Sequence, residues 1–145
     1  MFKHILLPTD GSPASERAIA QAVAFAKDAK ARITGLHVMQ EFHLVTYQIE
    51  MLEDTREQFM KDCQAKADAF LSALKSAADK EGVPCETVCV TGDLPHEAIV
   101  RMAEGKGCDV IVMASHGRKG ITGFLLGSET QKVLSHTKKP VLVLH

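Results

Sequence analysis

Aromatic residues are scarce in this sequence: phenylalanine, tyrosine and tryptophan together make up 5% of the chain, and tryptophan is absent. Proteins that hold single-stranded nucleic acid commonly stack bases on aromatic side chains and attract phosphates with excess positive charge. Here 17 Lys and Arg stand against 18 Asp and Glu, which gives a formal net charge of -1. Both features argue against nucleic acid as a partner, and the simplest interpretation of any local basic cluster is a solvated face.

Long apolar runs are also missing. The sequence has no stretch of about 18 apolar residues, the length that crosses a membrane as a helix. Residues 1–8 are too short and turn polar too early for a secretory signal peptide, and they suggest a first strand instead. We therefore expect a cytoplasmic protein with no membrane partner.

Cysteine and histidine do not have metal-site spacing. The four cysteines contain no C-x-x-C pair, and a cytoplasmic location disfavours disulfides. They are Cys63, Cys85, Cys89 and Cys108. Small buried apolar side chains are the simplest interpretation, with a redox or metal role as the alternative. The seven histidines form no spaced cluster either, so we predict no metal site.

What the sequence does contain is a regular alternation of strand-like and helix-like segments. Apolar residues make up 46% of the 145 residues, enough for one domain with a substantial core. Short apolar runs bounded by turn residues predict strands, and apolar positions three and four apart predict helices. The expected strands cover residues 2–7, 32–39, 85–90, 109–114 and 141–144, and the expected helices cover about 13–30, 49–82, 95–105 and 129–136.

This order predicts a single α/β domain over residues 1–145. Alternating strands and helices, with strands that are apolar on both faces, indicate a doubly wound, five-stranded parallel sheet with helices on both faces. Ligands of such sheets bind beyond the carboxyl ends of the strands, where the strand order reverses.

Two helix starts carry capping signals. Ser12 followed by Pro13 has the residue types preferred at the N-cap and at the first helical position. Ser128 is expected to cap the last helix, with Gln131 at the spacing of a capping box.

The most informative motif links the fourth strand to the last helix. Ser115, His116 and Gly117 form a turn at the strand end, and after nine further residues Gly127 and Ser128 open the helix. Glycine lets the backbone approach a ligand closely, and the first amides of a helix have no partner within it. Two such places in one loop predict a phosphate cradle.

Each residue of this candidate site also has a structural interpretation. Asp10, after the first strand, would accept a hydrogen bond from a base or sugar, or would stabilise the turn into the first helix. Glu129 would repel phosphate unless it points away or helps to hold a magnesium ion. Arg118 would neutralise phosphate or would simply be a basic loop residue.

Signals for catalysis are absent. The P-loop pattern that places a lysine on the terminal phosphates does not occur. Ser115 and His116 are sequence neighbours at a strand end, so they point to opposite sides and make a poor nucleophile–base pair. We therefore predict no catalytic residue, with slow hydrolysis of a bound nucleotide as an alternative.

Four segments that together span the chain resemble the universal stress protein family. They are residues 5–12, residues 36–38, the motif from Ser115 to Ser128, and residues 140–144. The resemblance implies the strand order 3-2-1-4-5 of adenine nucleotide alpha hydrolase-like proteins, with the first and fourth strands adjacent. It also implies a homodimer joined through Val141 to Leu144, and pairing would protect this apolar edge strand from aggregation.

The nucleotide-binding branch of this family has the pattern Gly, two residues, Gly, nine residues, Gly, then Ser or Thr. Gly117, Gly127 and Ser128 match the pattern, whereas Ala114 replaces its first glycine. Alanine would be tolerated there if the backbone is extended, because only a positive φ would disfavour it. The resemblance therefore implies ATP as the ligand.

Carried over by position, the implied site has an adenine side, a ribose side and a phosphate side. Asp10 would contact the adenine, Val38 would pack beside it, and Pro8 and Thr9 would line the pocket. The other residues are Met113 and Ala114 on the ribose side, and His116, Gly117, Arg118, Gly127, Ser128, Glu129 and Thr130 around the phosphates.

The resemblance favours a dimeric, cytoplasmic stress-response regulator that binds ATP, with an unidentified protein partner. The alternatives are a dimeric adaptor of the same fold that binds no nucleotide, and a weak ATPase.

Overall fold

The computed structural model describes residues 1–41, 49–115 and 126–145, with the backbone alone for residues 49–54. Strands and helices alternate as expected, and their bounds agree with the predicted ones to within two residues. They are β1 (His4–Pro8), α1 (Pro13–Ala29), β2 (Arg32–Met39), α2 (Ile49–Lys80), β3 (Cys85–Thr91), α3 (Pro95–Gly105), β4 (Val110–Ala114), α4 (Ser128–His136) and β5 (Val141–Leu144).

The strands form one parallel sheet in the order β3-β2-β1-β4-β5. The central strand β1 pairs with β2 on one side, where Ile5 lies opposite Ile33, and with β4 on the other, where Ile5 lies opposite Val110. The strand order therefore reverses between β1 and β4. This confirms the predicted doubly wound sheet and its strand order.

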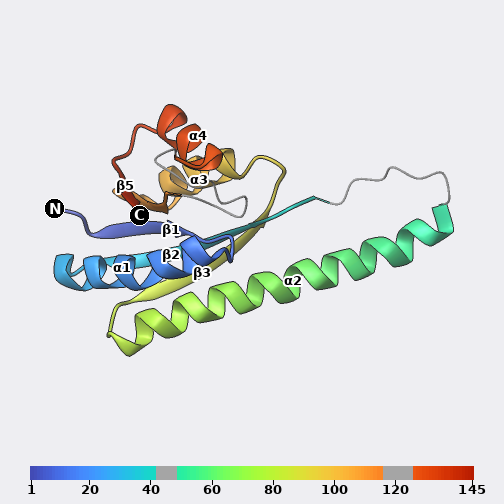
Figure 1. Cartoon of the computed structure of the whole chain (residues 1–145), viewed down its shortest axis with the longest axis horizontal. Coiled ribbons are helices and arrows are strands. Elements are labelled where there is room, and N and C mark those ends of the chain that lie inside the picture. The colour runs from blue at the N-terminus through green and yellow to red at the C-terminus, as the bar shows by residue number, and fades with distance from the viewer. Residues whose placement is uncertain (42–48, 116–125) are drawn as a thin grey trace.

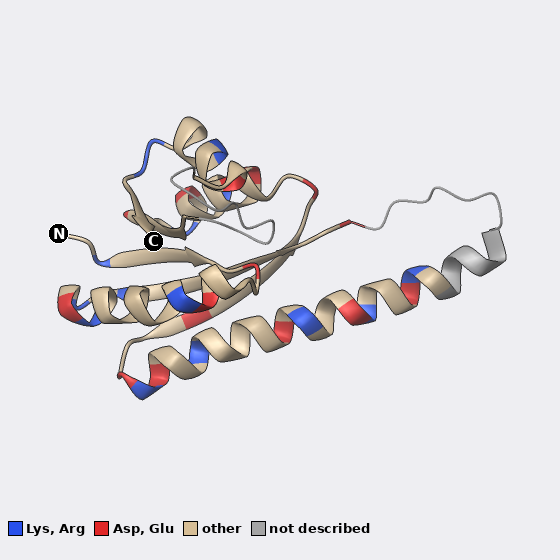
Figure 2. Ribbon diagram, in the orientation of Figure 1, with Lys and Arg blue, Asp and Glu red and all other residues tan. Residues whose placement is uncertain are grey.

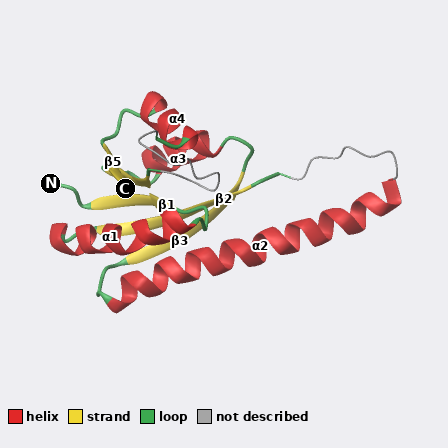
Figure 3. Cartoon of the chain, viewed as in Figure 1, coloured by secondary structure: helices red, strands yellow, loops and turns green. Residues whose placement is uncertain are grey.

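Helices cover both faces of this sheet (Figures 1 and 3). The helices α1 and α2 lie on one face, and α3 and α4 lie on the other. Ile5 and Leu7 of β1 are buried in the α1–α2 core, while Leu6 between them is buried in the α3–α4 core. A strand that is apolar on both faces is what a fully covered parallel sheet requires. The edge strand β3 is the exception, with Glu86 and Thr87 exposed.

The long helix α2 contacts the sheet through its C-terminal half. Ala67, Leu71, Leu74 and Ala78 are buried, at the spacing of one helix face. Acidic and basic residues alternate along its exposed surface, so the helix has no face of a single charge (Figure 2). None of the helices in the described part of the chain combines the length and the apolar character needed to cross a bilayer.

The four cysteines are free thiols. Cys108 is fully buried, and burial raises the pKa of its thiol to about 11. Burial also raises the pKa values of Cys85 and Cys89, which are half-buried. All three therefore carry neutral thiols at neutral pH. The interpretation as a small buried residue fits Cys108 best.

A buried histidine joins three strands at the amino end of the sheet. The Thr34 hydroxyl donates to Glu86 Oε1 (2.9 Å), so it accepts from His4 Nε2 (2.7 Å). This places the imidazole proton on Nε2. His4 Nδ1 is then an unprotonated buried nitrogen without a hydrogen-bond partner. Burial, followed by the charge of Arg32, lowers the pKa of His4 below 6.5.

We predict that this histidine makes the fold less stable in mild acid. The unfolded chain takes up a proton near pH 6.5, before the folded protein does, so the free energy of unfolding falls as the pH drops below that value. Urea unfolding at about pH 7.5 and about pH 5.5 measures the loss, which His4→Gln should reduce because its amide donates to Thr34 without titrating. An equal loss in both proteins would contradict the prediction.

Candidate functional site

The carboxyl ends of the central strands lie along one edge of the sheet, and three helices begin at that edge. Because all strands are parallel, α1, α3 and α4 each start just beyond the strand that precedes them in the chain. The start of a helix carries partial positive charge from its unpaired amides. The partial positive charges of these three helix starts therefore gather at this edge of the sheet.

The ends of β1 and β2 are locked together at this edge. The Thr9 amide donates to the Leu36 carbonyl (2.8 Å), and His37 Nδ1 donates to the Thr9 carbonyl (2.8 Å). Val38 is half-buried and packs against the α3–α4 core. Pro8, Thr9 and Val38 are thus brought to neighbouring strand ends.

Asp10 stabilises the start of α1. Its Oδ1 accepts from the Ser12 amide (2.9 Å) and from the Ser15 hydroxyl (2.7 Å). Ser12 holds the predicted N-cap position, and its side chain accepts from the Ser15 amide (3.1 Å). The structural role considered for Asp10 from the sequence is therefore present. The adenine contact implied by the family stays a prediction.

Gly11 is packed so tightly that it leaves no room for a side chain. Its φ is +74°, and a Cβ built on it would lie 2.2 Å from Cζ of Phe70. The Phe70 ring also meets the His37 ring edge-on, with 5.3 Å between their centroids. Phe70 of α2 therefore packs against the turn that contains Asp10 and Gly11.

We predict that Gly11→Ala destabilises the protein, because alanine disfavours this φ and its Cβ would displace Phe70. The cost should be roughly 1–3 kcal/mol in urea unfolding. Gly92→Ala is the matched control, since a Cβ there meets nothing within 4 Å and no left-handed φ is involved. The prediction would be wrong if the two variants unfolded at the same urea concentration.

The end of β4 is joined to the start of α4. The Gly127 amide donates to the Ser115 carbonyl (2.6 Å), and the Thr130 hydroxyl donates to the Ala114 carbonyl (2.9 Å). The start of α4 is therefore held directly against the end of β4. Ala114 ends β4 in extended geometry, where alanine is tolerated as expected. The predicted residues His116, Gly117 and Arg118 lie outside the described residues.

Helix α4 begins with a glycine cap, so the prediction that Ser128 caps it was wrong. Gly127 holds the N-cap position with φ -59° and ψ 151°, and Ser128 is the first helical residue. The predicted partner Gln131 instead donates from Nε2 to the Leu126 carbonyl (2.7 Å). The first amide bonded within the helix is that of Gln131, which donates to the Gly127 carbonyl. The three amides before it belong to residues 128–130, and helix geometry gives them no partner within α4.

Side chains of the predicted ribose and phosphate residues serve other contacts. Met113 is buried in the α3–α4 core, and the buried Thr130 hydroxyl is bonded to Ala114. Ser128 is exposed at the helix start. The Gly127 amide, which the sequence suggested as a phosphate donor, is taken by Ser115. In the described part of this site, the hydrogen-bond donors left for a ligand therefore come from the main chain of α4 more than from side chains.

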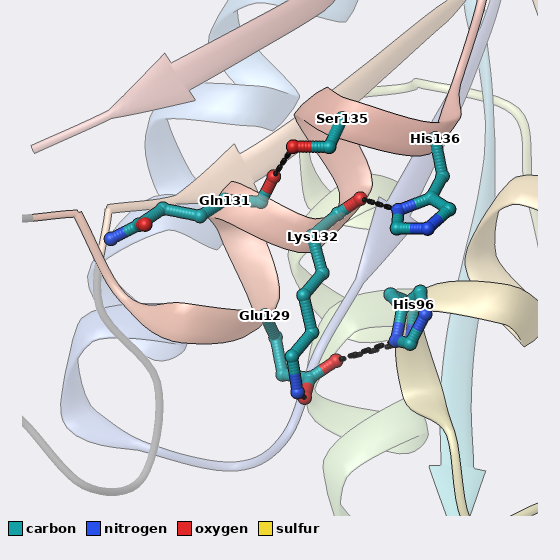
Figure 4. Close-up of polar contacts among 6 residues, drawn as sticks. All are labelled: His96, Glu129, Gln131, Lys132, Ser135 and His136. Carbon is teal, nitrogen blue, oxygen red and sulfur yellow. Dashed lines mark hydrogen bonds and ion pairs between the residues drawn. The ribbon is translucent and has the colours of Figure 1, made fainter.

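Glu129 points away from the start of its own helix. Its Oε2 accepts from the His96 amide of α3 (3.1 Å), and its Oε1 lies 3.3 Å from Lys132 Nζ (Figure 4). Two alternatives for Glu129 follow from the sequence, that it points away from a phosphate or that it helps to hold a magnesium ion. The observed contacts correspond to the first. No three His, Cys, Asp or Glu side chains among residues 1–41, 49–115 and 126–145 are grouped to hold a metal ion.

Two histidines with positioning roles were not predicted from the sequence. His37 holds the Thr9 carbonyl, and His96 holds Glu129. Their partners are 28 and 33 residues away in the sequence, and no local pattern marks such contacts. Ser15 was also missed, although its position three residues after the cap Ser12 is a local signal.

Comparison with known proteins agrees with this geometry. The model of the universal stress protein family matches residues 1–145, the whole chain. This chain belongs to the universal stress protein family.

Relatives of this universal stress protein match it along nearly its full length. The universal stress protein MJ0577 of Methanocaldococcus jannaschii is 31% identical over 155 residues, covering 99% of this chain and 95% of the relative. The universal stress protein YxiE of Bacillus subtilis is 32% identical over 148 residues, covering 99% of both chains.

Solved structures match the fold as well. The structure of MJ0577 has a TM-score of 0.85 at 33% identity and covers 99% of this chain and 96% of its own. The structure of a universal stress protein in complex with cAMP has a TM-score of 0.68 at 25% identity and covers 99% of this chain and 97% of its own.

Proposed function

We propose that this protein binds an adenine nucleotide, with ATP as the ligand, at the carboxyl edge between β1 and β4, and that it acts as a dimeric stress-response regulator. The observation that carries the proposal is the glycine N-cap of α4 at the point where the strand order reverses. This is the place where open parallel sheets bind their ligands.

The three helix starts at this edge differ in how their amides are satisfied. Helix α1 is capped by the Ser12 side chain, and the His96 amide of α3 is bonded to Glu129. At α4 the cap is Gly127, which has no side chain to offer. Its φ and ψ are open to any residue, and the position is buried. A residue without a side chain there would let a phosphate approach the amides of residues 128–130.

Adenine and ribose would occupy the strand ends beside this phosphate site. Val38, Pro8 and Thr9 supply a partly apolar wall, and the Asp10 carboxylate would accept from the adenine in addition to its role in the turn. A nucleotide ligand is also supported by the relative whose structure contains cAMP. ATP is proposed because Gly117, Gly127 and Ser128 match the pattern of the nucleotide-binding branch.

Magnesium would accompany the phosphates rather than bind to Glu129. The Glu129 carboxylate already contacts His96 and Lys132, on the side that faces α3. A cation held between phosphate oxygens needs no protein carboxylate, because Mg²⁺ keeps several waters.

We predict that Gly127→Asp abolishes ATP binding while the fold persists. Aspartate is a favoured N-cap residue, so it would cap α4 with its own carboxylate and occupy the amides that the phosphate needs. Isothermal titration calorimetry with Mg-ATP measures the loss. Urea unfolding measures how far the added cap offsets the cost of a carboxylate at this buried position.

Gly127→Asn is the matched control for this experiment. Asparagine caps a helix about as well and has nearly the same shape, but it carries no charge. It should therefore bind ATP more weakly than the parent protein and more strongly than the aspartate variant. Unchanged affinity in Gly127→Asp would refute this site. A parent protein that binds no nucleotide would favour the adaptor function, and ADP formed in the same samples would favour the weak ATPase.

The proposed dimer interface is β5, the strand from Val141 to Leu144. It lies at the edge of the described sheet, its four residues are half-buried, and all are apolar. An apolar edge of this kind is an aggregation hazard unless it is covered. Antiparallel pairing with β5 of a second copy would cover it. The cytoplasmic location stays a prediction from the sequence, as does the protein partner.

We predict that Val143→Lys converts the dimer to a monomer. Leu142 and Leu144 pack against the α1–α2 core and Val141 packs against the α3–α4 core, so position 143 tolerates a charge best. Lysine on an edge strand opposes pairing between sheets. Light scattering coupled to size exclusion measures the mass. Thr87→Lys, exposed on the opposite edge strand β3, should remain dimeric. A dimeric Val143→Lys protein would argue against this interface.

A further inference from the structure

Glu129 occupies an unusual position for a carboxylate in a phosphate site. It is the second residue of α4, within the first turn, next to the amides assigned above to the phosphate. A carboxylate in the first turn is attracted to the positive end of its own helix. Left to itself, the Glu129 side chain would compete with a phosphate for those amides and would repel it.

Contacts from α3 turn this carboxylate away (Figure 4). Glu129 Oε2 lies 3.1 Å from the His96 amide nitrogen and 3.6 Å from His96 Nδ1. The His96 side chain is 10% exposed, and its Nδ1 has no hydrogen-bond partner in the described structure. This nitrogen faces the Glu129 carboxylate at a distance just beyond a hydrogen bond.

A second histidine keeps the His96 ring in place. The rings of His96 and His136 are 5.0 Å apart between centroids. His136 Nδ1 donates to the Lys132 carbonyl one turn earlier in α4 (2.6 Å), which fixes that ring on the helix. The His96 ring thus sits between Glu129 and a ring that α4 itself holds.

Lys132 completes the arrangement from within α4. Its Nζ lies 3.3 Å from Glu129 Oε1, at the i,i+3 spacing that brings two side chains together on a helix. One oxygen is thus held by α3 and the other by α4.

We propose that His96 and Lys132 are positioning residues that hold the Glu129 carboxylate off the phosphate amides and so set the affinity for nucleotide. This inference rests on the proposed function, since it concerns the same amides. Packing between α3 and α4 then controls whether the site accepts an anion. A partner that moved α3 would release Glu129 and expel the nucleotide.

A mutant cycle tests this role. The pair His96→Ala and Lys132→Ala removes the imidazole and the ammonium from Glu129 and keeps the bond from the residue 96 amide. It is introduced into the parent protein and into Glu129→Gln, and the affinity for Mg-ATP is measured by calorimetry. In the parent, we expect the pair to weaken binding by about two- to fivefold, the size of a helix-terminus charge effect. In Glu129→Gln the same pair should weaken binding less, because no carboxylate is released. The difference between the two losses is the coupling.

Ser135→Ala is the control for α4. Ser135 is exposed on the same helix and bonds only the Gln131 carbonyl among the contacts shown in Figure 4, so its variant should bind ATP as the parent does. Equal losses in both backgrounds, or a fall in affinity for Ser135→Ala as large as that for the pair, would overturn the positioning role. Thermal unfolding of each variant identifies losses that come from a disrupted fold.

A readout without nucleotide separates this inference from the proposed function. In nuclear magnetic resonance spectra of the ligand-free protein at neutral pH, the amide signals of residues 128 and 130 should move when Glu129 is replaced by Gln in the His96→Ala/Lys132→Ala protein. The same replacement in the parent should move them less. This pattern without ATP binding would overturn the nucleotide function alone. ATP binding without this pattern would overturn the positioning role alone.

Discussion

The hydrogen bond from the Gly127 amide to the Ser115 carbonyl decides where α4 begins, and the candidate site depends on it. Together with the bond from Thr130 to Ala114, it fixes the first turn of α4 against the end of β4. Since β4 pairs with β1, the amides of residues 128–130 are held at the reversal of strand order. A rigid anion site needs this kind of support, because donors on a free loop would lose entropy on binding.

The carboxylates of Asp10 and Glu129 bond at the starts of α1 and α3, and the start of α4 is the one proposed to bind an anion. Asp10 stabilises the entry to α1, and Glu129, although part of α4, satisfies an amide of α3. Each of these charges lies at a positive helix end, where it is stabilised. The start of α4 has a glycine at the corresponding position. Under the proposed function, binding of a nucleotide and packing of α3 on α4 would be linked, because both would depend on where the Glu129 side chain goes.

The fold was largely predictable from the sequence, and the residues show why. Alternating apolar runs and helical stripes gave the elements, and Ser12 with Pro13 gave the start of α1 correctly, since both signals are local. The cap of α4 was placed one residue too late, because serine suits both the N-cap and the first turn. The bond between Gly127 and Ser115 decided that choice, and it joins residues that no local pattern relates. The gathering of Pro8, Thr9, Val38 and Ala114 was predictable, because parallel strands end at one edge.

By itself, the sequence determined the element order and the parallel sheet, and it predicts the edge at which a ligand would bind. These follow from hydrophobic periodicity and from the rule that such connections place carboxyl ends together. Only the tertiary structure decided that Asp10 stabilises a turn, that Glu129 faces α3, and that His4, His37 and His96 act as buried partners. Those contacts depend on which side chains meet when the helices pack on the sheet. They join segments that are remote in the sequence, and hydrophobic periodicity does not predict which remote side chains lie within a few ångströms of each other.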